Sequence, residues 1–175
     1  MAAKDEQRQD NALGRRGTSQ GAGRTLICMS YIDSSSLLKT LWEEPESRAV
    51  REAIAAEQEV VISTLAELET EVQLRAKWLG GALTKTRYEA YRKKLSSFRE
   101  TAPFEFRDLS GAVFRRAIEQ HLAGKWHCRS LDRLHVAAMD ELGQRRLLTN
   151  DAKQAAAARA LGYEIVSPGM GLPER

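Results

Sequence analysis

Three aspartates stand at similar places in separate segments, each where an apolar run gives way to a helical pattern. Asp33 follows the run at 25–32, Asp151 follows RRLLTN at 145–150, and Asp132 lies in the first turn of a predicted helix with Ser130 as its expected N-cap. Neighbouring carboxylates repel one another unless a cation lies between them, and all-oxygen ligands suit Mg²⁺ or Mn²⁺ better than zinc or copper. A single aspartate at a helix start is more often a cap than a ligand, so spacing alone leaves both interpretations open.

The elements around these acids predict that they gather at one edge of a sheet. Apolar runs predict strands at 25–32, 59–63, 104–109, 145–150 and 163–166. Helical patterns occupy 34–42, 46–57, 64–78, 84–100, 110–122, 131–142 and 151–162. Strands alternating with helices favour an α/β fold, here a mostly parallel sheet of four to five strands with helices on both faces. Such sheets bind ligands outside the carboxyl ends of their strands.

Composition bounds the organisation of the chain. Its 175 residues, 42% hydrophobic and 29% charged, suit one folded domain, and the net charge of +3 permits an anionic partner. No apolar run is long enough to span a bilayer, and the N-terminus lacks the apolar core of a secretory signal. We expect Cys28 and Cys128 to be reduced thiols of a cytoplasmic protein. Residues 1–24 carry almost no large apolar side chain and are predicted to be a disordered extension, followed by a domain at 25–169 and a tail at 170–175.

Four segments resemble, in order, the PIN-domain family and within it the VapC-like toxins of bacterial toxin–antitoxin pairs. They are YIDSSSLLK at 31–39, ISTLAELETEV at 62–72, RSLDRLHVAAMDELG at 129–143 and LLTNDAKQAAAARALGYEIVSPG at 147–169. The resemblance implies a PIN-like three-layer fold and a nuclease domain over 25–169. It also implies an endoribonuclease in which metal-activated water attacks the RNA. Its catalytic, Mg²⁺- or Mn²⁺-binding carboxylates would be Asp33, Glu69, Asp132 and Asp151.

The second of these acids is the least certain match. Glu67 and Glu71 flank Glu69, and at helical spacing they share a face that Glu69 does not. The register set by Ser63 favours Glu69, with Glu67 as the alternative. His135, three residues after Asp132, is interpreted as a packed, hydrogen-bonded helix residue rather than a ligand.

Other side chains are expected to support the site. Thr149 and one of Ser34 to Ser36, with Ser34 as the preferred candidate, would hold a ligand water or a carboxylate. A basic helix would track the RNA backbone, with Tyr88 and Tyr91 interleaved, through Lys85, Arg87, Arg92, Lys93 and Lys94. The alternative is a solvated surface helix whose tyrosines pack inward.

The resemblance also implies partners. VapC-like toxins pair as homodimers and are silenced by a small antitoxin, for which the apolar positions of the helices at 34–42 and 46–57 form a predicted docking groove. Two other functions remain open. One is a housekeeping PIN-type RNA-processing nuclease with the same chemistry. The other is a non-catalytic PIN-like module that binds RNA or protein.

Overall fold

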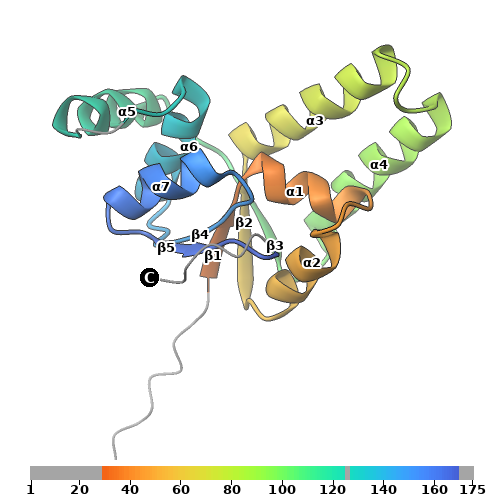
Figure 1. Cartoon of the computed structure of the whole chain (residues 1–175), viewed down its shortest axis with the longest axis horizontal. Coiled ribbons are helices and arrows are strands. Elements are labelled where there is room, and N and C mark those ends of the chain that lie inside the picture. The colour runs from red at the N-terminus through yellow and green to blue at the C-terminus, as the bar shows by residue number, and fades with distance from the viewer. Residues whose placement is uncertain (1–28, 125–126, 170–175) are drawn as a thin grey trace, which may run out of the picture.

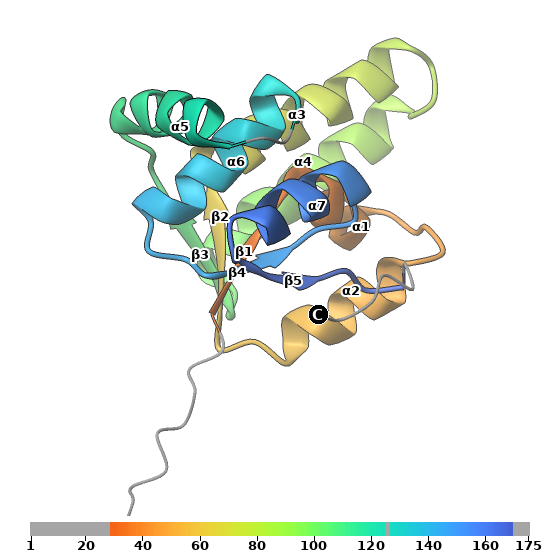
Figure 2. The same ribbon diagram turned by 60° about the vertical axis from the view of Figure 1, so that its left-hand side comes forward.

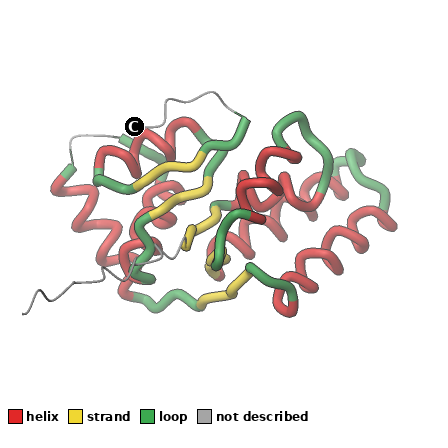
Figure 3. Tube along the Cα trace, turned by 90° about the horizontal axis from the view of Figure 1, so that it is seen from below, coloured by secondary structure: helices red, strands yellow, loops and turns green. Residues whose placement is uncertain are grey.

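Five strands of the described chain form one parallel sheet in the order β3-β2-β1-β4-β5. Their bounds are β1 Met29–Ile32, β2 Glu59–Ser63, β3 Phe104–Arg107, β4 Arg146–Leu148 and β5 Glu164–Val166. The computed structural model describes residues 29–124 and 127–169, so the predicted N-terminal extension, the C-terminal tail and Cys28 lie outside the described residues. The wholly parallel sheet, seen between two groups of helices in Figure 3, confirms the expected α/β architecture.

The helices follow the strands as the sequence predicts, with ends that differ by a few residues. Their bounds are α1 Ser34–Leu41, α2 Ser47–Ala55, α3 Thr64–Leu79, α4 Lys85–Ser97, the 3₁₀ helix η1 Phe98–Glu100, α5 Ala112–Ala123, α6 Ser130–Glu141 and α7 Ala152–Ala160. Gly162, with a φ of +82°, turns the chain from α7 into β5. Among the described helices, none has the length and apolar character required to cross a membrane.

Adjacent residues of each central strand face opposite layers. Ile32 and Leu148 join the core beneath α1 to α4, whereas Tyr31 and Leu147 join the core beneath α5 to α7. This alternation is the two-residue period of a strand, and it explains why the strands are apolar throughout rather than on one side. Figure 1 shows the two helical layers on either side of the sheet, and Figure 2 shows the same division after a turn of the molecule.

Most of the large apolar residues predicted to form the antitoxin groove are buried. Leu37, Leu41, Val50 and Ile54 of α1 and α2 are each at most 5% exposed and pack on the sheet in the protein's own core. Leu38 and Trp42 are only partly buried. The amphipathic pattern of these two helices therefore mainly reflects burial against the sheet, and it leaves Leu38 and Trp42 partly accessible.

Helices α3 and α4 form an antiparallel hairpin that extends away from the sheet (Figure 1). The stacked rings of Trp78 and Tyr88 join them, with centroids 4.8 Å apart and planes 11° apart. Tyr91 meets the ring of Trp42 edge-on at 6.1 Å. Both tyrosines of the basic helix thus pack inward, as the solvated-helix alternative predicts.

Candidate active site

Asp33 lies directly after β1 and caps the N-terminus of α1. Its carboxylate is 1% exposed. It accepts hydrogen bonds from the Ser36 N–H at 2.9 Å, the Ser35 hydroxyl at 2.9 Å and the Thr149 hydroxyl at 2.5 Å. Burial raises the pKa of Asp33, although the charge of His135 and these hydrogen bonds act in the opposite direction. The donors that hold this buried acid are all uncharged.

Asp151 also lies between a strand and a helix, separated from β4 by Thr149 and Asn150. Its side chain caps α7 by accepting from the N–H groups of Lys153 at 2.8 Å and Gln154 at 3.0 Å. Its own N–H donates to the Thr149 hydroxyl at 3.0 Å. Because that hydroxyl in turn donates to Asp33, a single threonine links the two strand-end acids.

Asp132 lies in the first turn of α6, on the side of the helix that faces the same region. The sequence predicted Ser130 as the N-cap, but the cap is Arg129, and Ser130 is the first helical residue. Asp132 accepts from the Arg129 N–H at 3.2 Å, which closes a reciprocal capping arrangement. Burial raises the pKa of Asp132, and the like charge of Asp151 adds to this effect.

Glu69 projects from the second turn of α3 and pairs with His135 of α6. One carboxylate oxygen lies 2.5 Å from His135 Nε2. Burial alone would raise the pKa of Glu69, but the hydrogen bond and charge of His135, with a hydrogen bond from Ser34, lower it. His135 is 2% exposed and also meets the Tyr31 hydroxyl, in agreement with its prediction as a packed, hydrogen-bonded residue.

The geometry separates Glu69 from the two glutamates beside it. Glu67 forms an ion pair with Arg99 at 2.7 Å, and Glu71 pairs with Arg92 at 2.7 Å. Both partners belong to the α4 side of the α3–α4 hairpin, so Glu67 and Glu71 face away from the aspartates. Glu69 is the glutamate of the three that lines the cavity described next.

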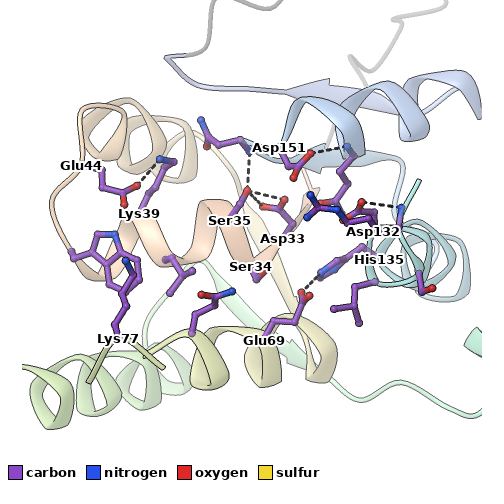
Figure 4. Close-up of a pocket in the computed structure, with 18 residues that line it drawn as sticks. Asp33, Ser34, Ser35, Lys39, Glu44, Glu69, Lys77, Asp132, His135 and Asp151 are labelled. Atoms are coloured by element: carbon purple, nitrogen blue, oxygen red, sulfur yellow. Dashed lines mark hydrogen bonds and ion pairs between the residues drawn. The ribbon is translucent and has the colours of Figure 1, made fainter. Parts of the chain in front are cut away.

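One cavity of about 580 Å³ is bounded by all four predicted acids. Figure 4 shows Asp33, Asp132, Asp151 and Glu69 gathered toward one end, while Lys39, Glu44 and Lys77 lie toward the other. The four acids come from the starts of α1, α6 and α7 and from α3, all at the carboxyl edge of the sheet, as parallel-sheet topology predicts.

The serines next to Asp33 divide between two acids. Ser35, rather than the preferred Ser34, donates to Asp33, and Ser34 interacts with Glu69. Thr149 holds Asp33 as expected. The two predicted supporting residues, Thr149 and Ser34, therefore each contact a carboxylate of the site. Thr149 and Ser35 contact Asp33, whereas Ser34 contacts Glu69.

The basic residues predicted to track the RNA backbone lie outside this cavity. Lys85, Arg87, Arg92, Lys93 and Lys94 of α4 do not line it. Its positively charged side chains come from other elements and are Lys39, Lys77 and Arg129. Lys39 is held by Glu44 at 2.6 Å and Glu46 at 3.0 Å, whereas Lys77 lies over the ring of Trp42, 5.0 Å from its centroid. Glu69, Gln73 and Lys77 recur at four-residue spacing, so a helix places them on one face. This spacing was the sequence signal that could have indicated Lys77.

The acids are held apart in this arrangement. Across residues 29–124 and 127–169, no group of three or more His, Cys, Asp or Glu side chains is placed so that it could hold a metal ion. Asp132 and Asp151 instead accept from helix N–H groups, and Glu69 accepts from His135. The four acids still suit a hard divalent cation, because their ligand atoms are carboxylate oxygens. One of them, Asp33, is buried and receives hydrogen bonds only from uncharged groups.

A wholly parallel α/β sheet with an acid-lined cavity at its carboxyl edge defines the class of this protein. The family model of the PIN domain matches residues 30–162, and the chain belongs to the PIN-domain family. A curated relative is Ribonuclease VapC46 of Mycobacterium tuberculosis (strain ATCC 25618 / H37Rv). It is 29% identical over 140 residues, which cover 79% of this chain and 96% of the relative.

Solved structures share the fold at lower sequence identity. VapC20 of Mycobacterium tuberculosis, described as a sarcin-ricin loop cleaving toxin, superposes with a TM-score of 0.60 at 15% identity, covering 80% of this chain and 99% of that one. VapBC2 from Rickettsia felis, bound to a DNA fragment from its promoter, gives a TM-score of 0.58 at 15% identity and covers 80% and 98%. At these identities the likeness establishes the fold.

Proposed function

We propose that this protein is a metal-dependent endoribonuclease and the toxin of a VapBC-like toxin–antitoxin pair. The observation that carries the proposal is the placement of Asp33, Glu69, Asp132 and Asp151 around one cavity at the carboxyl edge of the sheet. The ribonuclease named among the relatives supports RNA as the substrate. The proposed domain extends over residues 25–169, slightly beyond the family match at 30–162.

The four acids are the proposed ligands of Mg²⁺ or Mn²⁺. When bound, such an ion lowers the pKa of its water and neutralises charge that develops on the phosphate. Asp33 and Asp151 would hold the ion from the carboxyl edge of β1 and β4, and the Thr149 hydroxyl links the Asp33 carboxylate to the backbone N–H of Asp151. Asp132 and Glu69 complete the acidic end from α6 and α3.

The opposite end of the cavity is the proposed path of the RNA backbone. Lys77 is exposed and lies on the cavity wall, next to Trp42. Its ammonium group attracts phosphate, while a neighbouring indole offers a surface on which a base can stack. We place the α4 cations outside this path, because Arg92 is paired with Glu71 and Lys94 donates to the Thr40 carbonyl.

A second copy of the chain is the proposed partner of the α3–α5 apolar face. This face carries Phe114, Ile118 and Leu122 at four-residue spacing on α5, exposed by 60%, 60% and 79%, with Leu68 of α3 exposed by 60% beside the same groove. An apolar stripe of this size marks an interaction surface, and a two-fold axis would bury it against itself. Homodimers are what the likeness to VapC-like toxins implies.

A small antitoxin is the second proposed partner, supported by the toxin–antitoxin complexes among the structural relatives. Within the predicted helix groove, the antitoxin would contact the partly exposed Leu38 and Trp42, which line the cavity, because the other large apolar residues are buried in the core. We also propose a cytoplasmic location, in keeping with the free thiol of Cys128 and an RNA substrate.

The test is RNA cleavage by wild type and Asp33→Asn with Mg²⁺, with Mn²⁺ and with EDTA. We expect cleavage that requires the metal and is absent from the variant. Cleavage by both proteins would refute the assignment of the site, and no cleavage by the wild type on any RNA would support a non-catalytic binding module. Growth arrest on expression, relieved by a co-purifying small protein from the native host, separates a toxin from a housekeeping nuclease.

A further inference from the structure

A chain of hydrogen bonds connects the cavity to the centre of the sheet. Glu69 meets His135 Nε2 at 2.5 Å, and the other ring nitrogen, Nδ1, lies 2.7 Å from the Tyr31 hydroxyl. That hydroxyl lies 2.6 Å from the Ser63 hydroxyl, which caps α3 by accepting from the Ala66 N–H. His135 and Tyr31 take no part in the proposed metal chemistry, yet both are almost completely buried.

The geometry holds the His135 ring at both of its nitrogens. A carboxylate oxygen accepts, so His135 Nε2 donates to Glu69. The Tyr31 hydroxyl contacts Nδ1, the other nitrogen of the ring, and the Ser63 hydroxyl contacts the Tyr31 hydroxyl in turn.

Given the proposed nuclease function, we propose that Tyr31 and His135 are positioning residues that hold the Glu69 carboxylate at the acidic end of the cavity. Without the Tyr31 hydroxyl, Nδ1 of the buried ring loses its partner, and the ring is no longer held with Nε2 toward Glu69. The outer hydrogen bond of one buried ring therefore determines where an acid of the site points.

The surroundings of Tyr31 allow this role to be tested cleanly. Its ring packs among apolar residues of the sheet and α6 and meets the His135 ring edge-on, with centroids 5.7 Å apart. Phenylalanine keeps that ring and removes one oxygen. Tyr163 offers a matched control, because it is 6% exposed in the same core and its hydroxyl interacts with Asp140 rather than with an acid of the cavity.

The experiment compares wild type, Tyr31→Phe and Tyr163→Phe in two ways. Mn²⁺ binding is measured without RNA by titration calorimetry, and the ¹⁵N chemical shifts of the His135 ring are measured in metal-free protein. Tyr31→Phe should change the shift of Nδ1, which loses its partner, and weaken Mn²⁺ binding about tenfold, as loss of a ligand's supporting hydrogen bond typically does. Tyr163→Phe should change neither.

A conservative replacement of the ring gives a second test. His135→Gln retains an N–H donor toward Glu69 and should keep most of the Mn²⁺ affinity, whereas His135→Leu should lose it. Wild-type Mn²⁺ affinity in Tyr31→Phe would overturn the positioning role alone. A wild type that neither binds Mn²⁺ nor cuts RNA would instead refute the proposed nuclease function, whatever the chemical shifts of His135.

Discussion

Replacing Asp33 by asparagine should abolish cleavage and at the same time stabilise the metal-free protein at neutral pH. The carboxylate is 1% exposed, and burial raises its pKa, so the fold disfavours the ionised form. Asparagine has nearly the same shape and is an equally good N-cap, so the hydrogen bond from the Ser36 N–H should persist. The acid is therefore retained at a cost in stability.

The size of the effect follows from the donors around the carboxylate. Three groups donate to it, namely the Ser35 hydroxyl, the Ser36 N–H and the Thr149 hydroxyl. Asparagine keeps one oxygen as an acceptor, but its NH2 group replaces the other, so the Thr149 hydroxyl must turn and accept instead of donating. We assign about 1 kcal/mol to each weakened or rearranged bond, or about 3 kcal/mol in total, whereas burying one ion costs several kcal/mol. The balance is a gain of about 1 kcal/mol, which raises the Tm of a domain of this size by about 2–4 °C.

The assay is thermal denaturation in EDTA at several pH values from 4 to 8. Because the pKa of Asp33 is higher in the folded than in the unfolded state, the contribution of Asp33 to wild-type stability should fall as the pH rises from the unfolded value through the folded one. The stability of Asp33→Asn relative to wild type should therefore increase over this range. Asp108→Asn, at an exposed aspartate, is the control and should match wild type. An Asp33→Asn variant less stable than wild type throughout would refute the reasoning, because the hydrogen bonds would then outweigh the burial of charge.

Three further changes separate the parts of the proposed site. Glu69→Gln should reduce cleavage at least about 100-fold because it removes a ligand. Glu67→Gln, on the α4 side of the same helix, should cleave within about twofold of the wild-type rate. Equal losses would contradict the assignment of Glu69. Lys77→Ala should raise KM about fivefold with little change in kcat, since an exposed ion pair contributes about 1 kcal/mol, and the difference should shrink in high salt. A KM that ignores salt would exclude a phosphate contact. Ile118→Asp should turn a dimer into a monomer in analytical ultracentrifugation, and an unchanged mass would place the interface elsewhere.

The aspartates could be located from the sequence because their positions follow from local rules. Apolar runs indicate the strands, and the residue after a parallel strand reaches the carboxyl edge whatever the rest of the chain does. Asp33 obeys this rule, whereas Asp151 follows β4 after Thr149 and Asn150, and both aspartates cap the helix that follows. The start of α6 was less well predicted. Serine is the more common N-cap residue, but the N-cap is Arg129, whose backbone N–H donates to the Asp132 carboxylate.

The remaining features depend on contacts between distant segments. Tyr31 and His135 are 104 residues apart in the chain, and His135 and Glu69 are 66 apart, so no local pattern reveals their connection. The basic pattern of α4 suggested an RNA surface, but the helix side that meets the cavity depends on how the α3–α4 hairpin folds. Lys77 is one charged residue among many in α3, and the sequence does not distinguish it from the others. The structure identifies it because it lies on the cavity wall, over the ring of Trp42.

The strand order has a consequence for synthesis on the ribosome. β1 and β4 are neighbours in the sheet although one is made at the start of the domain and the other near its end. The hydrogen bond between Asp33 and Thr149 spans 116 residues, so a nascent chain lacks this contact until almost the whole domain has been translated. A protein that cuts RNA would thereby stay inactive beside its own messenger during elongation, and every prematurely terminated product ending before β4 would be harmless.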